Sequence, residues 1–430
     1  MDRERAETYL RLLAEAELRD ATITARSRAG RWDSARLALA ARVLSAVGAV
    51  GADVADQIQA DVRLAVARRH GLPDAGPGRV RIRLTSPRTS WRAVPVGQLI
   101  EFRDGDVRRE VLVMAYLQSA DGARLIAAGW PLRPFTAADD QGVSYYIHWA
   151  RTPAVTLLPL RPDPPHHIRW LDLTTAVGEP ATRIDLDGHI PAPDVTVTPA
   201  AHSPGELLLD VIAARILGLA PFSQHSPGQL MPADAELRAF VGDWPGQIAA
   251  VLHAAGVLPP DSPVPGQLAG LCARLGLDGH GIAAPPDQDL PERWHSMLTC
   301  PRLREPSASA APGMLAATVA ELPGLDGAEI TIAGLHPGER GTIVHLLVSG
   351  VTLEDEWKFD RGVMPLPVLW IRDSGGRWHA THTAGRTQVG DIVVLSMRII
   401  PPLDRGTTWI EIAAAGWSAE VRVTLPLGSD

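Results

Sequence analysis

Two segments of this chain, 239 positions apart, carry the same residue pattern, and this internal repeat constrains the fold more than any other sequence feature. One runs from Arg169 to Leu186 and the other from Thr408 to Leu425. In each, a tryptophan precedes an apolar–acidic–apolar alternation, small residues follow, and an arginine opens a second alternation at the same offset. A period of two is typical of a strand with one buried face. The pattern therefore predicts two related β-hairpins.

The phase of the alternation predicts which hairpin side chains are buried. Because successive side chains of a strand point to opposite faces, residues of one phase share a core. The buried set is Leu171, Leu173, Ile184 and Leu186 in the first hairpin and Ile410, Ile412, Val423 and Leu425 in the second. The opposite phase holds the tryptophans and the acids, which we predict to face outward.

The outward residues Trp170, Asp172, Trp409 and Glu411 form the candidate interaction surface. Tryptophan is in excess among the aromatic residues, with 12 Trp against 5 Phe and 4 Tyr, and it is enriched at binding hot spots. Two alternatives stay open for these rings: helices of the same chain cover them, or a partner or ligand does.

Strand-like runs precede both hairpins, so each hairpin lies at the end of a longer β-rich segment. The runs are Val80 to Leu84, Val111 to Tyr116, Leu125 to Ala128, Val143 to Trp149 and Val155 to Leu160 before the first hairpin, and Glu329 to Ala333, Thr342 to Val348, Val368 to Arg372 and Ile392 to Ile399 before the second. They are short, and no helix long enough for a parallel crossover separates them. We therefore predict two related antiparallel immunoglobulin-like β-sandwiches.

Two other segments have the periodicity of amphipathic helices. Residues 3–70 carry apolar stripes, whereas residues 204–298 follow Ser203 and contain Ser226, each serine being followed by Pro, Gly and then Glu or Gln. Serine at the N-cap with an acid or amide at N3 is a capping box. The N-terminal unit is too small to be stable alone, so it should dock on the next domain, on a copy of itself or on a partner.

The expected fold class is α+β multidomain, with two sandwiches, an N-terminal helical hairpin or three-helix unit and a helical middle domain. The expected boundaries are 1–72 for the N-terminal unit, 78–190 for the first sandwich, 191–203 for a linker, 204–305 for the helical domain, 306–314 for a second linker and 315–428 for the second sandwich. Regularly spaced prolines in the first linker and Ser and Ala in the second indicate extended connections.

Charge and composition bear on several function classes. The net charge of -8 is mild and supplies no broad basic field, so neither nucleic acid nor anionic lipid is expected as a partner. The first residues lack a signal-peptide pattern and no apolar run reaches membrane-spanning length, so we expect no membrane association and a cytoplasmic location. Two cysteines, Cys272 and Cys300, fit a reducing compartment. Lys358 is the only lysine among many arginines, which is typical of a high-GC bacterium.

Two histidine–serine neighbours resemble an activated nucleophile, in which an imidazole takes the proton of a hydroxyl. They are His202 with Ser203 and His225 with Ser226. Neighbours in sequence rarely reach that geometry, and helix capping already explains both serines. We therefore assign no catalytic residue.

Residue types that ligate metals occur without the spacing that metal sites need. Strand neighbours one or three positions apart point to opposite faces, and calcium loops and zinc sites have fixed ligand spacings. The groups that fail these tests are His166 with His167, His379 with His382, Glu354 to Glu356 with Asp360, and Cys272 and Cys300 with His280 and His295. We assign neither a metal nor a cofactor.

The leading hypothesis is a non-enzymatic binding or assembly protein whose duplicated β surfaces contact a protein partner or a second copy of the chain. The alternative is a hydrolase or transferase at the junction of the middle helices and a sandwich, with dispersed residues His225, Asp243, His280 and His295. A third possibility is a nucleic-acid regulator that uses the arginines of the first helices. It is opposed by the acids that match them, Glu4, Glu7, Glu15, Glu17 and Asp20. The sequence identifies no small-molecule ligand.

Overall fold

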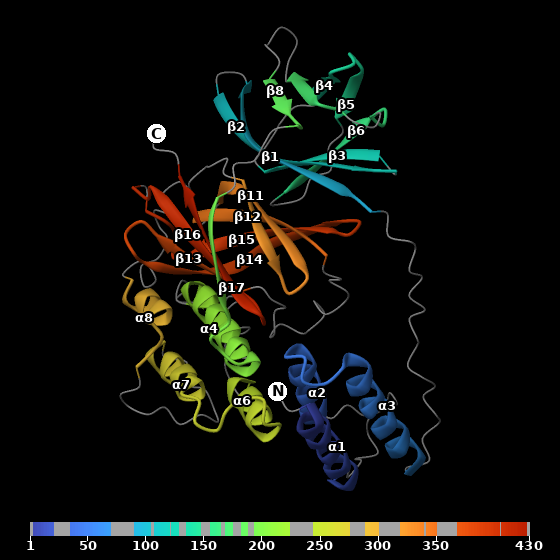
Figure 1. Cartoon of the computed structure of the whole chain (residues 1–430), viewed down its shortest axis with the longest axis vertical. Helices are drawn as coiled ribbons and strands as arrows, with labels where there is room; N and C mark the ends of the chain where they lie inside the picture. Colours follow the sequence, from blue (N-terminus) through green and yellow to red (C-terminus); the bar gives the residue numbers. More distant parts are fainter. Residues whose placement is uncertain are drawn as a thin grey trace.

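The computed structural model describes residues 3–20, 35–69, 90–104, 107–120, 122–128, 135–147, 155–164, 168–174, 182–187, 193–223, 244–275, 289–300, 319–338, 341–350, 368–404 and 406–427. The described elements form three layers, with a second β-sheet between a first β-sheet and a layer of helices (Figure 1). The fold is therefore α+β, with two antiparallel β-rich parts and helices.

The first sheet contains eight antiparallel strands. They are β1 (Arg92–Asp104), β2 (Val107–Ser119), β3 (Gly122–Ala128), β4 (Phe135–Asp139), β5 (Ser144–Ile147), β6 (Thr156–Arg161), β7 (Trp170–Thr174) and β8 (Thr182–Asp185). Their order across the sheet is β1-β2-β3-β6-β5-β4-β7-β8. The strands expected from Val111 to Leu160 correspond to β2, β3, β5 and β6, whereas the run Val80 to Leu84 lies outside the described residues.

The second sheet repeats this order and adds one strand. Its strands are β9 (Asp194–Pro199), β10 (Ala320–Leu325), β11 (Ala328–Gly338), β12 (Gly341–Ser349), β13 (Val368–Asp373), β14 (Trp378–Val389), β15 (Ile392–Ile400), β16 (Trp409–Ala415) and β17 (Ala419–Pro426). The order is β10-β11-β12-β15-β14-β13-β16-β17-β9. Without β9, this is the order of the first sheet strand for strand, so the two sheets share one topology.

Strand β9 comes from the segment expected as a linker at 191–203. It pairs with β17, and Val195 lies opposite Val423. The prolines around it indicate an extended chain, and an extended chain can pair with an open sheet edge. This segment therefore contributes to the second sheet instead of only connecting two parts.

The immunoglobulin-like sandwich is not confirmed, because the strands of each part join one continuous sheet that curls in a barrel-like way. In the first sheet, Gln98 Nε2 of β1 donates a hydrogen bond to the backbone oxygen of Arg183 on β8 at 2.7 Å. In the second, the Asp326 carboxylate next to β10 accepts one from the backbone N–H of Ser418 next to β17 at 3.0 Å. An alternating strand has one buried face in either architecture, so the sequence pattern does not distinguish them.

Both hairpins bury the predicted faces. All eight residues of the inward phase are at most 5% exposed. The register differs between the copies, however: Leu171 lies opposite Ile184, whereas Ile410 lies opposite Leu425 and not Val423. The second strand is thus shifted by two residues relative to the equal offset of the sequence pattern. A shift of two keeps the same side chains inward, which a shift of one would not.

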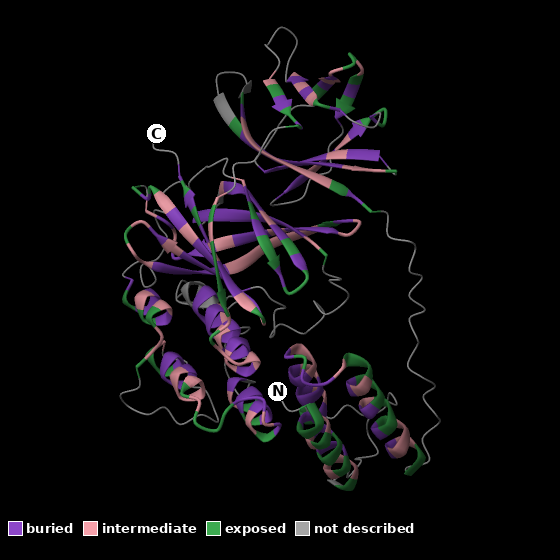
Figure 2. Cartoon of the chain, viewed as in Figure 1, coloured by how far each residue is buried: buried purple, intermediate pink, exposed green. Residues whose placement is uncertain are grey.

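Helices from two distant parts of the chain form one layer. They are α1 (Arg3–Asp20), α2 (Ala35–Ala46), α3 (Ala52–Arg69), α4 (Pro204–Ser223), α6 (Trp244–Ala254), α7 (Val264–Arg274) and α8 (Glu292–Thr299). Their apolar sides share a core with the outer face of the second sheet, while α1 and α3 keep exposed outer sides (Figure 2). The N-terminal helices therefore dock on the middle helices, with α2 against α6, and not on the sheet that follows them in sequence.

The first helix of the middle segment begins at the predicted capping box. The backbone N–H of Ser203 donates to Glu206 Oε2 at 2.7 Å, and the backbone N–H of Glu206 donates to Ser203 Oγ at 3.3 Å. This reciprocal pair satisfies donors that a helix start leaves free. The second predicted box, at Ser226, lies outside the described residues. Among the helices that the structure describes, none combines the length and apolarity needed to cross a membrane.

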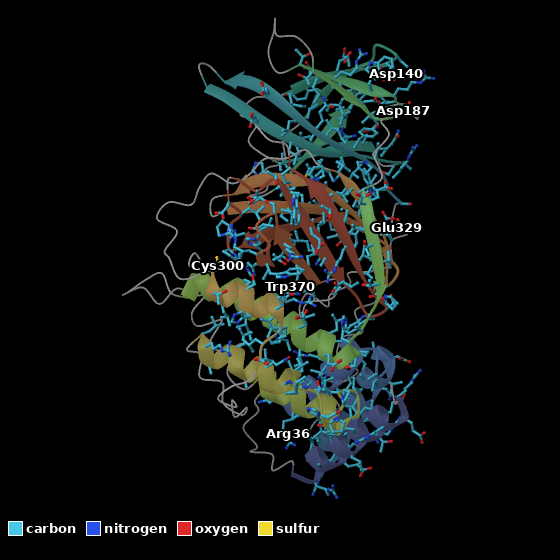
Figure 3. The ribbon with its side chains drawn as sticks, turned by 60° about the vertical axis from the view of Figure 1, so that its left-hand side comes forward. Arg36, Asp140, Asp187, Cys300, Glu329 and Trp370 are labelled. Carbon is cyan, nitrogen blue, oxygen red and sulfur yellow. The ribbon has the colours of Figure 1, made fainter. Side chains whose placement is uncertain are left out.

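One carboxylate joins the helices to the second sheet. Asp210 of α4 accepts hydrogen bonds from Nε1 of Trp294 on α8 at 2.8 Å and from Nε1 of Trp370 on β13 at 3.1 Å. Both indole rings are at most 1% exposed, so their N–H groups need an acceptor inside the protein. Arg293 Nη1 lies 3.5 Å from the same carboxylate. Figure 3 shows Trp370 where the second sheet meets the helices.

The two sheets are held together by an apolar core of their own. Outward-facing residues of both sheets form it: Trp91, Leu112, Met114, Ala115, Leu117, Ile126, Ala128 and Val155 of the first part, and Ala333, Leu347, Val389, Ile392 and Val394 of the second. Burying this apolar area stabilises the packing of the two sheets against each other. The second sheet thus has both of its outer sides covered, one by helices and one by the first sheet.

Replacing Asp210 by alanine should lower the free energy of unfolding by about 2–5 kcal/mol, because two buried indole N–H groups and a guanidinium lose their shared acceptor. Urea denaturation followed by tryptophan fluorescence measures the change. Glu292→Ala, at an exposed acid on α8, is the control and should change little. A loss for Asp210→Ala no larger than for the control would contradict this role.

Leu171→Asp and Ile410→Asp should each unfold the sheet that contains the change, because an unpaired charge in the core costs several kcal/mol. Both side chains are 0% exposed. Thermal melting followed by circular dichroism is the measurement, with the exposed Thr424→Asp on the same hairpin as the control. Unchanged melting of either core variant would show that the inward phase is assigned wrongly.

Candidate functional site

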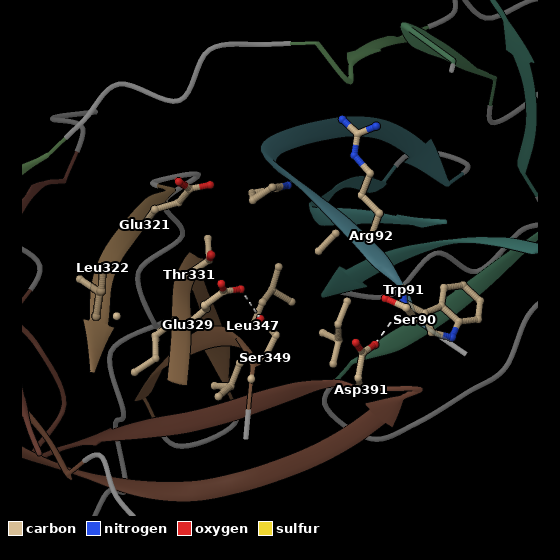
Figure 4. A pocket seen from close by; sticks show the side chains of 17 residues that line it. Ser90, Trp91, Arg92, Glu321, Leu322, Glu329, Thr331, Leu347, Ser349 and Asp391 are labelled. Carbon is tan, nitrogen blue, oxygen red and sulfur yellow. Dashed lines mark hydrogen bonds between the residues drawn. The ribbon is translucent and has the colours of Figure 1, made fainter. Parts of the chain in front are cut away.

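A cleft of about 730 Å³ lies where the two sheets meet (Figure 4). One wall is formed by Ser90 and Trp91, which precede β1, and by Arg92, Ala93 and Pro95 at its start. The opposite side is formed by β10, β11, the end of β12 and the start of β15. Successive lining residues are typical of a strand edge, since a strand face presents every second residue. The cleft therefore combines an edge of the first sheet with an outer face of the second.

Three carboxylates border this cleft, those of Glu321, Glu329 and Asp391 (Figure 4). The strand alternation places two of them there: Ala320 and Leu322 are buried inside the second sheet, so Glu321 between them faces outward. Glu329 faces outward on β11 for the same reason. The charge of the described lining is acidic, because Arg92 is the single cation among the lining residues.

Two of the acids also hold parts of the cleft in place. Glu329 Oε2 accepts a hydrogen bond from Ser349 Oγ at 2.9 Å, across the β11–β12 ladder. Asp391 Oδ1 accepts one from the backbone N–H of Trp91 at 3.0 Å, which ties the start of β1 to the second sheet. The guanidinium of Arg124 lies 5.0 Å from the ring centre of Trp91. One hydrogen bond, from Trp91 to Asp391, thus connects the two walls of the cleft in addition to the apolar packing.

The predicted interaction surface is half-buried in both hairpins. In the first, Arg183 donates to both carboxylate oxygens of Asp172 at 2.8 and 2.9 Å, and its guanidinium lies 4.6 Å from the ring centre of Trp170. The hydrogen bond from Arg183 lowers the pKa of Asp172. A cation on one face of Trp170 and an ion pair beside it form an ordered polar surface.

The corresponding surface of the second hairpin is arranged differently. Arg422 Nη1 lies 3.4 Å from Glu411 Oε1, but its guanidinium lies over Trp378 and not over Trp409. The two-residue register shift explains this difference, because it moves the arginine from a directly opposite to a diagonal position. The two hairpin surfaces are related but not equivalent, and they lie on separate sheets.

Of the residues expected for an enzymatic site, only His295 lies in the described part of the chain. His295 is exposed on α8, whereas His225, Asp243 and His280 lie outside the described residues. Across the described ranges, no three His, Cys, Asp or Glu side chains converge as metal ligands. Cys272 is buried and burial raises the pKa of its thiol to about 11, as fits a cysteine that packs as a small apolar side chain.

An aspartate–histidine pair in the second sheet resembles a catalytic dyad. Asp373 Oδ2 lies 3.3 Å from His379 Nε2, and His379 Nδ1 lies 2.7 Å from the backbone oxygen of Pro401. Burial opposes ionisation of Asp373, but the contact with His379 and the backbone N–H of Arg377 outweigh it and lower its pKa to about 2. The carboxylate is 1% exposed and the imidazole 2%, so neither group meets solvent.

The first sheet contains a corresponding aspartate, and the comparison shows that the pair stabilises a β-turn. Asp139 Oδ1 accepts hydrogen bonds from the backbone N–H groups of residues 141 and 143, and its other oxygen accepts one from the Tyr145 hydroxyl. Asp373 Oδ1 accepts from the backbone of residues 375 and 377 in the same pattern, with His379 at the position of Tyr145. An aspartate that closes a tight β-turn is a structural element. The duplicated pattern therefore explains the pair without catalysis.

A serine–histidine pair is buried on the outer face of the second sheet. His345 Nδ1 lies 3.1 Å from Ser396 Oγ, and both side chains are 0% exposed. Burial and the neighbouring His336 lower the pKa of His345 to about 3, so the imidazole stays neutral. Because a nucleophile must reach its substrate, a pair with no exposed surface fits a packed polar contact.

Sequence reasoning did not single out Glu321, Glu329 or Asp391. A signal was present for the first two, since each interrupts an apolar alternation and must face outward. Their convergence with β1 depends on how the two sheets pack, which no local pattern specifies. No known protein family, curated protein or solved structure matches this chain.

Replacing Asp373 by asparagine should lower stability at neutral pH by about 2 kcal/mol. The pKa of Asp373 is lowered in the folded protein, so its ionised form stabilises the fold above the unfolded pKa of about 3.9. This contribution is lost as the pH falls toward 2. The stability difference between wild type and variant, measured by urea denaturation, should shrink between about pH 4 and pH 2. A constant difference across this interval would contradict the assignment; Asp261→Asn is the control.

Proposed function

We propose that this chain is a non-enzymatic binding protein that captures an extended basic segment of a partner protein in the cleft between its two sheets. The observation that carries the proposal is the lining of the cleft, with three carboxylates and one arginine around about 730 Å³. A cleft whose charge is of one sign attracts a ligand of the opposite sign and steers its approach.

The strand at the wall of the cleft supports an extended ligand. β1 is the terminal strand of the first sheet, and β2 is its only hydrogen-bonded neighbour among the described strands. An unpaired strand edge offers N–H and C=O groups to a peptide in extended conformation, although at this edge the N–H of Trp91 is bonded to Asp391 and Pro95 has no N–H. Successive residues of β1 line the cleft, so a peptide strand placed beside them would cross the outward acids of β10 and β11.

The spacing of side chains in an extended peptide fits this arrangement. Alternate residues of a strand point to one side, so arginines at every second position would face the acids together. Glu321 and Glu329 lie on the neighbouring strands β10 and β11 and face outward from the same sheet. Leu347, which belongs to the apolar core between the two sheets, lines the cleft beside these charges. The chemistry of the site therefore favours a segment that alternates basic and apolar residues.

The tryptophan surface stays a separate prediction for partner contact. Trp170 and Trp409 are half-buried, and the surfaces around them differ between the two sheets. Because the two tryptophan surfaces are not equivalent, we do not expect both to make the same contact with a partner that is bound in the cleft. The acidic cleft is the better supported site, because it combines concavity, charge and an open strand edge.

Binding of a short labelled peptide that alternates arginine and valine tests the proposal. We expect saturable binding to the full chain, which weakens as salt is raised because the attraction is between charges. Glu321→Gln with Glu329→Gln should weaken it by about tenfold or more. Fluorescence anisotropy is the measurement.

The control changes the same charge elsewhere. Glu292→Gln with Asp261→Asn neutralises two exposed acids of the helical layer and should leave the affinity unchanged. A peptide that alternates glutamate and valine should not bind. The absence of saturable binding to the basic peptide would overturn the proposal, as would equal affinities for the two double variants.

A further inference from the structure

One segment of the sequence has the residue pattern that the acidic cleft favours. In this basic segment, residues 79–84, arginine alternates with large apolar side chains: Arg79, Val80, Arg81, Ile82, Arg83 and Leu84. No other stretch of the chain has arginine at three alternate positions, and no acid occurs between Asp74 and Glu101. The segment lies outside the described residues, so only its sequence is compared with the cleft.

The charges of the cleft and of the basic segment are complementary. Glu321, Glu329 and Asp391 supply three carboxylates to the cleft, against the one guanidinium of Arg92. The segment supplies three guanidinium groups. Because alternate side chains of a strand point to one side, all three can face the carboxylates together. Complementary charges of this kind steer association and select the partner.

The apolar side of the basic segment matches the inner face of the first sheet. Val94 and Val96 of β1 are half-buried and pack against the core inside this sheet, at its terminal strand. Ala93 and Pro95, of the opposite phase, line the cleft. A strand added beside β1 would therefore need one apolar side and one basic side. The alternation of the segment supplies both.

The reach of the chain argues against the same copy as the source of this strand. Only residues 85–89 separate the segment from Ser90, and so short a connection requires antiparallel strands, with the segment turned back along β1. It would then be reached from Arg69, at the end of α3, through residues 70–78 alone. The chain from Arg69 to Arg79 spans at most about 35 Å when fully extended.

The path that this short stretch would have to cover is longer. α1 and α3 lie beyond the second sheet and point away from it (Figure 1), and Arg69 donates a hydrogen bond to the backbone oxygen of Leu18 near the end of α1. Returning along the 18 residues of α3 takes about 27 Å, and passing the middle helices and the second sheet takes about 20 Å more. A second copy of the chain has no such limit.

We propose that the acidic cleft binds the basic segment of a second copy of this chain. The inference rests on the proposed function, because it names the occupant of the same cleft. Each copy carries one cleft and one basic segment, so two copies that exchange segments form a closed, symmetric dimer. A basic segment of another protein would then compete with the second copy for the cleft.

Mixing two variants of the full chain tests the inference. Arg79→Gln with Arg81→Gln and Arg83→Gln neutralises the segment and keeps the cleft, whereas Glu321→Gln with Glu329→Gln neutralises the cleft and keeps the segment. The wild type should form a dimer that weakens as salt is raised, and each variant alone should dimerise about tenfold more weakly or less. An equimolar mixture should associate again, through the one intact segment and the one intact cleft. Analytical ultracentrifugation measures the molar mass.

The control removes the same charge elsewhere. Arg11→Gln with Arg19→Gln and Arg68→Gln neutralises three exposed arginines of α1 and α3 and should leave the dimer unchanged. A wild type that stays monomeric up to about 0.1 mM would overturn the inference. A mixture of the two variants that stays monomeric would overturn it as well, including the case in which the segment occupies the cleft of its own copy.

The variant with the neutralised segment tests the proposed function separately, since its cleft is intact. The peptide that alternates arginine and valine should bind this variant more tightly than it binds the wild type, because no second copy competes. A peptide that fails to bind this variant would overturn the proposed function. A monomeric wild type that binds the peptide would overturn only the inference about the second copy.

Discussion

The carboxylate of Asp210 connects the helical layer to the second sheet within the apolar core that the two share. It accepts the buried indole N–H groups of Trp294 and Trp370, one from a helix and one from a strand. The position of Trp370 in the first sheet is held by Thr136, which is exposed. A threonine there offers neither a large apolar ring nor an indole donor to a helix. Helices therefore cover this face of the second sheet, whereas Thr136 at the equivalent position of the first sheet is exposed among the described residues.

The two sheets keep their turns and differ in the residues that face other layers. Asp139 and Asp373 close the same turn with the same backbone hydrogen bonds. Facing the other layers, Ile126 of the first sheet corresponds to His345 of the second, and inside the sheets Tyr116 corresponds to Leu335. Turn contacts are local and depend on one side chain, whereas outward residues must match whatever packs on them. Ile126 and His345 thus differ where each copy has a different neighbour, whereas Tyr116 and Leu335 differ inside the sheets.

The sequence predicts the local features well because they depend on the hydrophobic periodicity of each strand and on the capping residues of each helix. The inward phase of both hairpins and the capping box at Ser203 are correct to the residue. The sandwich is not confirmed, since alternation defines one buried face per strand without saying how a sheet curls. The partner strand of β9 and the shifted register of β17 also depend on contacts between distant segments. The cleft could not be predicted for the same reason: its acids lie on three segments that only the packing of two sheets brings together.

The packing of the two sheets fixes the shape of the cleft that we propose as a binding site. The apolar core between the sheets and the hydrogen bond from Trp91 to Asp391 fix both walls of the cleft before any ligand arrives. A partner bound as proposed would then lose little free energy to ordering of this protein, and the attraction of the carboxylates would contribute more fully to affinity.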